Sequence, residues 1–298
     1  MKHTFFSIIA LLMPFLAQSA DIPNIPIAAP PIMSTQPAMR GSHFISDPKF
    51  LDAMKKDQAN KQLMNDLNGI GKDMMALTSE AQGKKPDKAR VQSIEARMET
   101  FVNQYPGSIN AIAMADRIIA LASFYGGMTG DKSMDAKQVW AAKRGLKLVE
   151  QWENANGSTE AVDAFRVDFI VPLINLQQEI SRAQWDKAEV HLKRSFNDDT
   201  LSTDTRCLDG HRLALFQMAK GDFAGMKATC DQGQKLSPSA RNSAAMSVGF
   251  LVLEARMLAA QGIPKKQNSA YAKAAKLIPP AQLDQAIKMP SKAKITAK

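Results

Sequence analysis

The segment of residues 214–238, ALFQMAKGDFAGMKATCDQGQKLSP, is followed 41 residues later by residues 255–279, ARMLAAQGIPKKQNSAYAKAAKLIP. Six aligned positions are identical, against roughly one or two expected from composition: Ala214, Ala219, Gly221, Lys235, Leu236 and Pro238 match Ala255, Ala260, Gly262, Lys276, Leu277 and Pro279. Each copy is predicted as a helix, a glycine turn, a second helix and a proline stop. Helical pairs repeated at a fixed period are typical of an α-solenoid, because one pair cannot bury its apolar faces alone.

The two copies resemble the tetratricopeptide repeat family. Four positions match the turn glycine, the first aromatic residue, a later large residue and the final proline of that family: Gly221, Phe223, Cys230 and Pro238. The next unit matches at Gly262, Tyr271, Ala274 and Pro279, and an earlier unit without the proline matches at Ala183, Trp185, Ala188, Leu192, Ser195 and Phe196. Met226 and Gln267 depart from the alanine of the family, and the period of 41 exceeds its usual length of about 34. The resemblance implies a right-handed α–α superhelix of helical hairpins with a groove that binds protein segments.

The composition and the apolar spacing predict an all-α fold independently of this resemblance. The chain has 43 alanines and only 10 valines, which favours helices over a large sheet. Val91, Ile94, Met98, Phe101 and Val102 follow one another at helical spacing. No segment shows sustained alternation of apolar and polar residues, so we expect no sheet.

The N-terminus is predicted to be a signal peptide, residues 1–20, cleaved near Ser19 or Ala20. A short basic start, an apolar run over residues 4–17 and small residues at the exit are the parts of such a leader. An uncleaved anchor is the alternative, although the run is shorter than the roughly 20 residues of a membrane span. The leader predicts a periplasmic or secreted protein. We expect no integral membrane segment after its removal, since no later apolar run is long and uncharged.

Three further segments follow the leader. Residues 21–45 hold five prolines and are predicted to be an extended linker. Residues 46–287 are predicted to be the tetratricopeptide-like helical domain, which starts at Ser46-Asp47-Pro48 with a capping side chain and a proline. Residues 288–298 form a basic tail that could weakly contact an anionic envelope surface or simply be solvated.

The formal net charge of +9 does not indicate nucleic-acid binding. Positive residues are interleaved with acids over residues 84–99, a pattern typical of a solvated helix face. No nucleic-acid-binding motif or series of stacking aromatic residues accompanies the charge. We therefore expect no nucleic-acid partner.

The two cysteines, Cys207 and Cys230, lie in one predicted hairpin. In an exported protein a disulfide between them is favoured, with two buried thiols as the alternative. His191 and His211 have no neighbouring residues that would complete a metal site, so we expect no metal. No phosphate-binding loop or hydrolase motif is present, so we expect no cofactor.

The function expected from these features is that of a non-enzymatic scaffold or adaptor that binds another envelope or secreted protein. From the inner surface of the resembled family, the binding residues are predicted on the first helix of a pair: Arg206, Asp209, Arg212 and Gln217. A first alternative is an enzyme of wall glycans with Glu160 or Glu179 as the acid, since glycan hydrolysis uses carboxylates. A second alternative is a basic structural protein that coats an anionic polymer.

Overall fold

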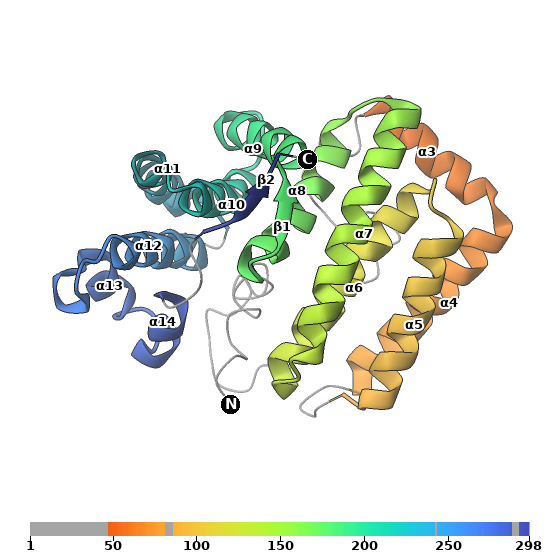
Figure 1. Ribbon diagram of the computed structural model, residues 1–298, viewed down its shortest axis with the longest axis horizontal. Coiled ribbons are helices and arrows are strands. Elements are labelled where there is room, and N and C mark those ends of the chain that lie inside the picture. Colours follow the sequence, from red (N-terminus) through yellow and green to blue (C-terminus); the bar gives the residue numbers. More distant parts are fainter. Residues whose placement is uncertain (1–46, 81–85, 242, 288–291, 298) are drawn as a thin grey trace. The chain divides into compact units, whose positions relative to one another are not determined.

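The computed structural model describes residues 47–80, 86–241, 243–287 and 292–297 of the chain. These residues are almost entirely helical, which confirms the all-α prediction (Figure 1). The predicted signal peptide and the proline-rich linker lie outside the described residues. The chain divides into two compact units between Pro172 and Leu173. We call the described residues 47–172 the N-terminal unit and those from 173 onward the C-terminal unit.

The N-terminal unit is a set of helices that pack mainly on their neighbours in the chain (Figure 1). Its elements are α3 (Pro48–Ala59), α4 (Lys61–Glu80), α5 (Lys88–Gln104), α6 (Ile109–Thr129), α7 (Ser133–Asn156) and the first part of α8 (Glu160–Asn175). Helix α4 packs on α5, α5 on α6 and α6 on α7, while α3 contacts both α4 and α6. The predicted apolar stripe of α5 is buried in this unit, as its helical spacing requires.

Helix α3 starts where the sequence predicts. The side chain of Asp47 accepts hydrogen bonds from the amides of Lys49 and Phe50, and Pro48 occupies the first turn. At the other end of α3, the buried Asp57 accepts hydrogen bonds from the Ser108 hydroxyl at 2.5 Å and from the Asn110 amide at 3.1 Å. This carboxylate therefore fixes the end of α3 to the N-terminus of α6, where a negative charge is favourable.

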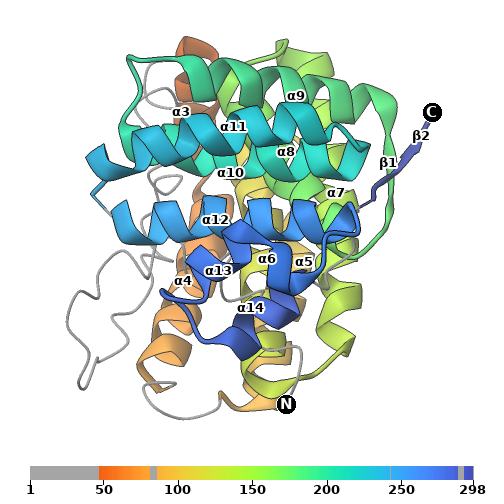
Figure 2. The same cartoon turned by 90° about the vertical axis from the view of Figure 1, so that its left-hand side faces the viewer.

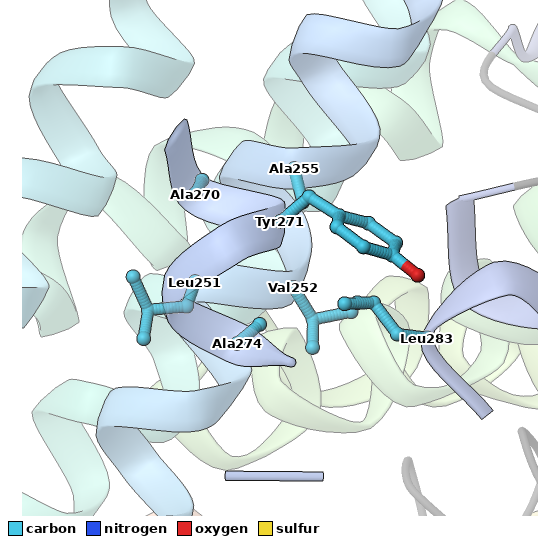
Figure 3. Packing of buried hydrophobic residues seen from close by; sticks show 7 residues of the cluster. All are labelled: Leu251, Val252, Ala255, Ala270, Tyr271, Ala274 and Leu283. Atoms are coloured by element: carbon cyan, nitrogen blue, oxygen red, sulfur yellow. The ribbon is translucent and has the colours of Figure 1, made fainter. Parts of the chain in front are cut away.

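In the C-terminal unit, too, most helices pack on their neighbours in the chain. Its elements are the end of α8, β1 (Glu179–Ser181), α9 (Arg182–Asn197), α10 (Thr203–Lys220), α11 (Phe223–Leu236), the 3-10 turn η2 (Ser237–Ser239), α12 (Ser243–Ala260), the 3-10 turn η3 (Lys265–Gln267), α13 (Ser269–Ala274), α14 (Pro280–Ile287) and β2 (Lys294–Thr296). Each of α9 to α12 packs on the next helix, and α12 also packs on α10 and α14. Figure 2 shows α9, α10, α11 and α12 side by side, with α13 and α14 next to α12. The last three helices enclose a small core, shown in Figure 3: Leu251, Val252, Ala255, Ala270, Tyr271, Ala274 and Leu283.

Two helices of the C-terminal unit end in the same glycine motif, as the repeat predicts. Gly221 after α10 and Gly262 after α12 have φ angles of 85° and 81°. After α10, the amide of Asp222 donates to the carbonyl of Gln217 and that of Gly221 donates to Met218. The amides that follow α12 make the equivalent two bonds. This pair of hydrogen bonds defines the Schellman motif. The motif needs one residue in the left-handed conformation, and glycine adopts it without a Cβ clash.

A third copy of this motif lies at a position that the sequence comparison did not identify. The amide of Gln178 donates to Leu173 and that of Gln177 donates to Ile174, and Gln177 has a φ of 53°. The turn of the earlier unit is therefore centred on Gln177, six residues before Ala183, which had been matched to the turn glycine. Ala183 instead lies in the first turn of α9.

The basic tail is not simply a solvated terminus. Its residues 294–296 form β2, which pairs in parallel with β1 so that Ile295 is in register with Ile180. The amide of Ala293 also donates to the carbonyl of Ala219 at 3.0 Å. The expectation of no sheet was therefore wrong for these two strands, because three-residue strands are too short to show alternation.

Two helices, α6 and α12, are long and apolar enough to cross a membrane by composition alone. In the structure each packs among other helices of its own unit, and 61% and 50% of their apolar windows are buried there. Such core helices satisfy the same criteria as membrane spans, so their apolar character is explained by this packing.

Candidate functional site

Helix α10, which carries the predicted binding residues, is the central helix of the C-terminal unit. It contacts α9, α11 and α12. Two glycines permit this close packing. A Cβ on Gly210 of α10 would lie 2.5 Å from the ring of Phe196, and one on Gly233 of α11 would lie 2.1 Å from the ring of Phe250. Each aromatic ring thus fits against a helix backbone, and most of α10 is covered.

The four predicted binding residues do not form one exposed surface. Asp209 and Gln217 are only 6% and 7% exposed, so a partner cannot reach them in this structure. Asp209 accepts hydrogen bonds from the Ser195 hydroxyl at 2.5 Å and from the Arg212 guanidinium at 3.0 Å. Asp209 and Gln217 are buried because the face of α10 that bears them packs on neighbouring helices, and their role in partner binding stays a prediction.

Arg206 and Arg212 remain partly exposed. The Nε of Arg206 donates to the carbonyl of Phe196 at 3.1 Å, near the C-terminus of α9, where a cation is favourable. Asp204, Leu208 and Arg212 are spaced four residues apart and are all partly exposed. We define these three residues as the outer face of α10. It combines an acid, an aliphatic side chain and a base on one helix side.

A buried carboxylate with two partly exposed lysines fixes α9 to α10. Glu189 accepts hydrogen bonds from the indole of Trp185 at 3.1 Å and from Lys220 at 3.0 Å, and it also pairs with Lys193. Although burial opposes ionisation, the lysine hydrogen bonds and charges lower the pKa of Glu189. The group thus holds two neighbouring helices in a fixed register.

His211 fixes α10 to α12. Its Nε2 lies 2.9 Å from the carbonyl oxygen of Met246, and its ring centroid lies 3.9 Å from that of Phe250. Since a carbonyl oxygen can only accept, Nε2 carries the proton. Burial lowers the pKa of His211 to about 4, and Nδ1 has no hydrogen-bond partner among the described residues. A neutral histidine in a helix interface has a structural role here.

The cysteines are separate thiols in this structure. Cys207 lies in α10 and Cys230 in α11, and both are fully buried. Burial raises the pKa of Cys207 to about 11 and that of Cys230 to about 12. This arrangement corresponds to the buried-thiol alternative rather than to the favoured disulfide, and thiols with such high pKa values react slowly.

The two acids predicted for the alternative of glycan hydrolysis, Glu160 and Glu179, lie on α8 and β1. The fully buried Arg166 of α8 pairs with Glu153 at 2.8 Å and also with Asp163, so these two carboxylates neutralise one buried cation. Glu160 lies in the first turn of α8, where an acid is favourable. Glu179 is exposed on β1, in register with Lys294 of β2.

The sequence interpretation missed the buried Glu95. It lies within the segment predicted to be a solvated helix face, yet it is only 1% exposed. Neither carboxylate oxygen has a hydrogen-bond partner among the described residues, and burial raises its pKa. Its position between Val91 and Met98 in the apolar stripe was the available signal, because residue 95 shares their helical face.

The described residues contain no group of three or more potential metal ligands. A shallow surface depression of about 160 Å³ lies between α4 and α5 and is lined by Asp66, Ile70, Arg97, Thr100, Phe101 and Gln104. It is smaller than the roughly 300–1,000 Å³ of typical small-molecule sites.

Comparisons with protein-family models, with curated proteins and with solved structures found no match for this chain.

Proposed function

We propose that this protein is a non-enzymatic helical-repeat scaffold or adaptor that binds another protein through the outer face of α10. The observation that carries the proposal is the repeated Schellman ending of α8, α10 and α12, followed each time by a further helix. Equivalent endings at residues 177, 221 and 262 suit a stack of helical hairpins, and such stacks commonly present extended surfaces to protein segments.

The packing of α10 on α12 supports the superhelical part of this proposal. In a solenoid, the first helices of successive pairs lie beside one another, and here α10 and α12 do so through His211 and Phe250. Contacts of Glu189 join α9 to α10, and Gly233 lets the Phe250 ring of α12 pack against α11, so we expect the stack to be rigid. A rigid surface loses little conformational entropy when it binds a partner.

The chemistry of the outer face suits a peptide or a protein segment. Leu208 supplies a partly exposed aliphatic contact, and Asp204 and Arg212 flank it with opposite charges. An apolar contact with charged neighbours is the usual composition of a protein interface. The proposed partner is another protein of the cell envelope or a secreted protein, in keeping with the predicted signal peptide and periplasmic or secreted location.

The proposal is tested by crosslinked capture of the tagged protein from its native cells, followed by mass spectrometry at low and high salt. The double variant L208R/R212E places a base at the aliphatic position of the outer face and an acid at its basic position. V190R/R194E on α9 is the matched control, because it makes the same change of net charge at two exposed positions with the same spacing. We expect a small set of proteins retained at high salt by the wild type and the control but lost from L208R/R212E. Retention of the same set by all three proteins would contradict the proposal.

A further inference from the structure

The net positive charge of this protein is concentrated at its C-terminal end. Residues 257–298 contain eight lysines and one acidic residue, Asp284, a net charge of +7 in a chain of net charge +9. The rest of the chain is nearly balanced. A surface of one charge sign at one end of a molecule favours contact with an extended surface of the opposite sign.

The single acid in this segment is already neutralised within the unit. Lys265 of η3 pairs with Asp284 of α14 at 2.7 Å, and the hydroxyl of Tyr271 donates to the same carboxylate at 2.7 Å. The ammonium of Lys265 also lies 4.6 Å from the centroid of the Tyr271 ring. These contacts hold α14 against α13 beside the small core drawn in Figure 3. Asp284 is therefore not available to offset the remaining lysines.

Three further lysines, Lys266, Lys273 and Lys276, are exposed around α13 and form what we call the lysine cap. Within the described ranges, no carboxylate forms an ion pair with any of them. Ala270, Tyr271 and Ala274 occupy the buried side of the same short helix and pack on α12. The lysine cap thus lies on the outer side of the last hairpin.

Two aliphatic side chains lie next to the lysine cap in the sequence. Leu277 follows Lys276 and is 58% exposed, and Ile263 precedes the η3 lysines and is 37% exposed. Exposed large aliphatic side chains would bury no apolar area in contact with a fully hydrated polymer. A lipid bilayer accepts both kinds of group, because the headgroups attract the ammonium ions and the interface takes up the aliphatic side chains.

We infer that the lysine cap, with Leu277 and Ile263, binds the surface of an anionic phospholipid bilayer. All basic residues after Arg256 are lysines. Lysine is a flexible point charge without the fixed geometry of arginine, which suits attraction to a charged surface rather than recognition of one headgroup. The site is separate from the outer face of α10, so a protein partner and a membrane can be bound independently.

The inference is tested by vesicle co-sedimentation of the full chain. Phosphatidylcholine vesicles with and without phosphatidylglycerol are compared, and the readout is the difference in partition coefficient between the two. Insertion of the apolar run at residues 4–17 into the bilayer would occur with both kinds of vesicle. The difference between the two partition coefficients therefore does not include it. The triple variant K266Q/K273Q/K276Q removes the lysine cap, and K61Q/K72Q/K147Q removes three exposed lysines of the N-terminal unit as a control of equal charge.

Each lysine near an anionic surface contributes roughly a fivefold factor, so removing the lysine cap should lower the partition coefficient on the order of 100-fold. The control triple should retain binding. Raising the salt from about 0.1 M to about 1 M, which shortens the Debye length from about 10 Å to about 3 Å, should release the wild type. An equal decrease of the partition coefficient in both triple variants, or no decrease in either, would overturn the inference.

Leu277→Gln leaves the charge unchanged and distinguishes a bilayer from a polymer. We expect it to weaken binding to anionic vesicles about fivefold, because part of a leucine side chain no longer enters the interface. Binding to soluble polyglutamate with no binding to anionic vesicles would overturn the choice of a bilayer, as would an unchanged partition coefficient for L277Q. Circular dichroism melting of each variant controls for loss of the fold.

Discussion

The imidazole of His211 on α10 lies 3.9 Å from the ring of Phe250 on α12, measured between centroids, and its Nε2 donates to the carbonyl of Met246. Phe250 in turn fits against the backbone of α11 at Gly233. Three helices therefore meet at one aromatic contact. The packing that the proposed hairpin stack needs depends on residues at this point.

Protonation of His211 is expected to destabilise the C-terminal unit. Burial lowers its pKa from 6.5 to about 4, so the unfolded chain binds a proton first as the pH falls. The free energy of unfolding is therefore highest above about pH 6.5, where the histidine is neutral in both states. It decreases by about 3 kcal/mol in total as the pH falls toward 4.

The measurement is the free energy of unfolding from urea titrations of the wild type and of His211→Gln at several pH values. The glutamine amide can still donate to Met246 but does not titrate in this range. We expect the stability advantage of the wild type to shrink on acidification. A difference that is independent of pH would contradict this role of His211.

Gly233→Ala is expected to destabilise the protein by about 1–3 kcal/mol or more, because the new Cβ would lie 2.1 Å from the Phe250 ring. Gly107→Ala is the control, since no atom lies within 4 Å of its added Cβ. This control should change the thermal midpoint little. Equal midpoints for both variants would show that Phe250 does not pack on α11 as described.

Glu95→Gln is expected to stabilise the N-terminal unit at pH 7, by about 1–2 kcal/mol. Burial raises the pKa of Glu95, so the folded state favours the protonated acid. Its ionisation costs stability as the pH rises above the ordinary value of 4.5, and the amide avoids that cost. Urea unfolding at pH 5 and pH 7 measures the effect, and a loss of stability at pH 7 would indicate that the carboxylate has a favourable charged partner.

The two cysteines are expected to be unreactive in the folded protein and to titrate as two free thiols after unfolding. Their raised pKa values leave little thiolate near neutral pH. The measurement is colorimetric thiol titration of protein purified from its native cells without reductant, before and after addition of guanidinium. Finding no thiol after unfolding would instead establish the disulfide that the sequence favours.

The sequence predicts the helices and the two glycine turns well, because apolar spacing and a required left-handed residue are both local signals. The turn at Gln177 is not predicted, because it has the same left-handed conformation without a glycine. Asp209 is predicted as a binding residue from the resembled family, and Glu95 as part of a solvated helix face. Their burial depends on helices distant in the sequence, such as the contact of Asp209 with Ser195, and local pattern cannot reveal it.

The central claim is that the outer face of α10 contacts a protein partner, and site-specific photocrosslinking in native cells tests it most directly. A photoreactive residue replaces Leu208 on α10 or, as a control, Val190 on α9, which is 63% exposed in the same unit. We predict a discrete crosslinked protein adduct from position 208 and none from position 190. An adduct from position 190 with none from position 208 would contradict the claim.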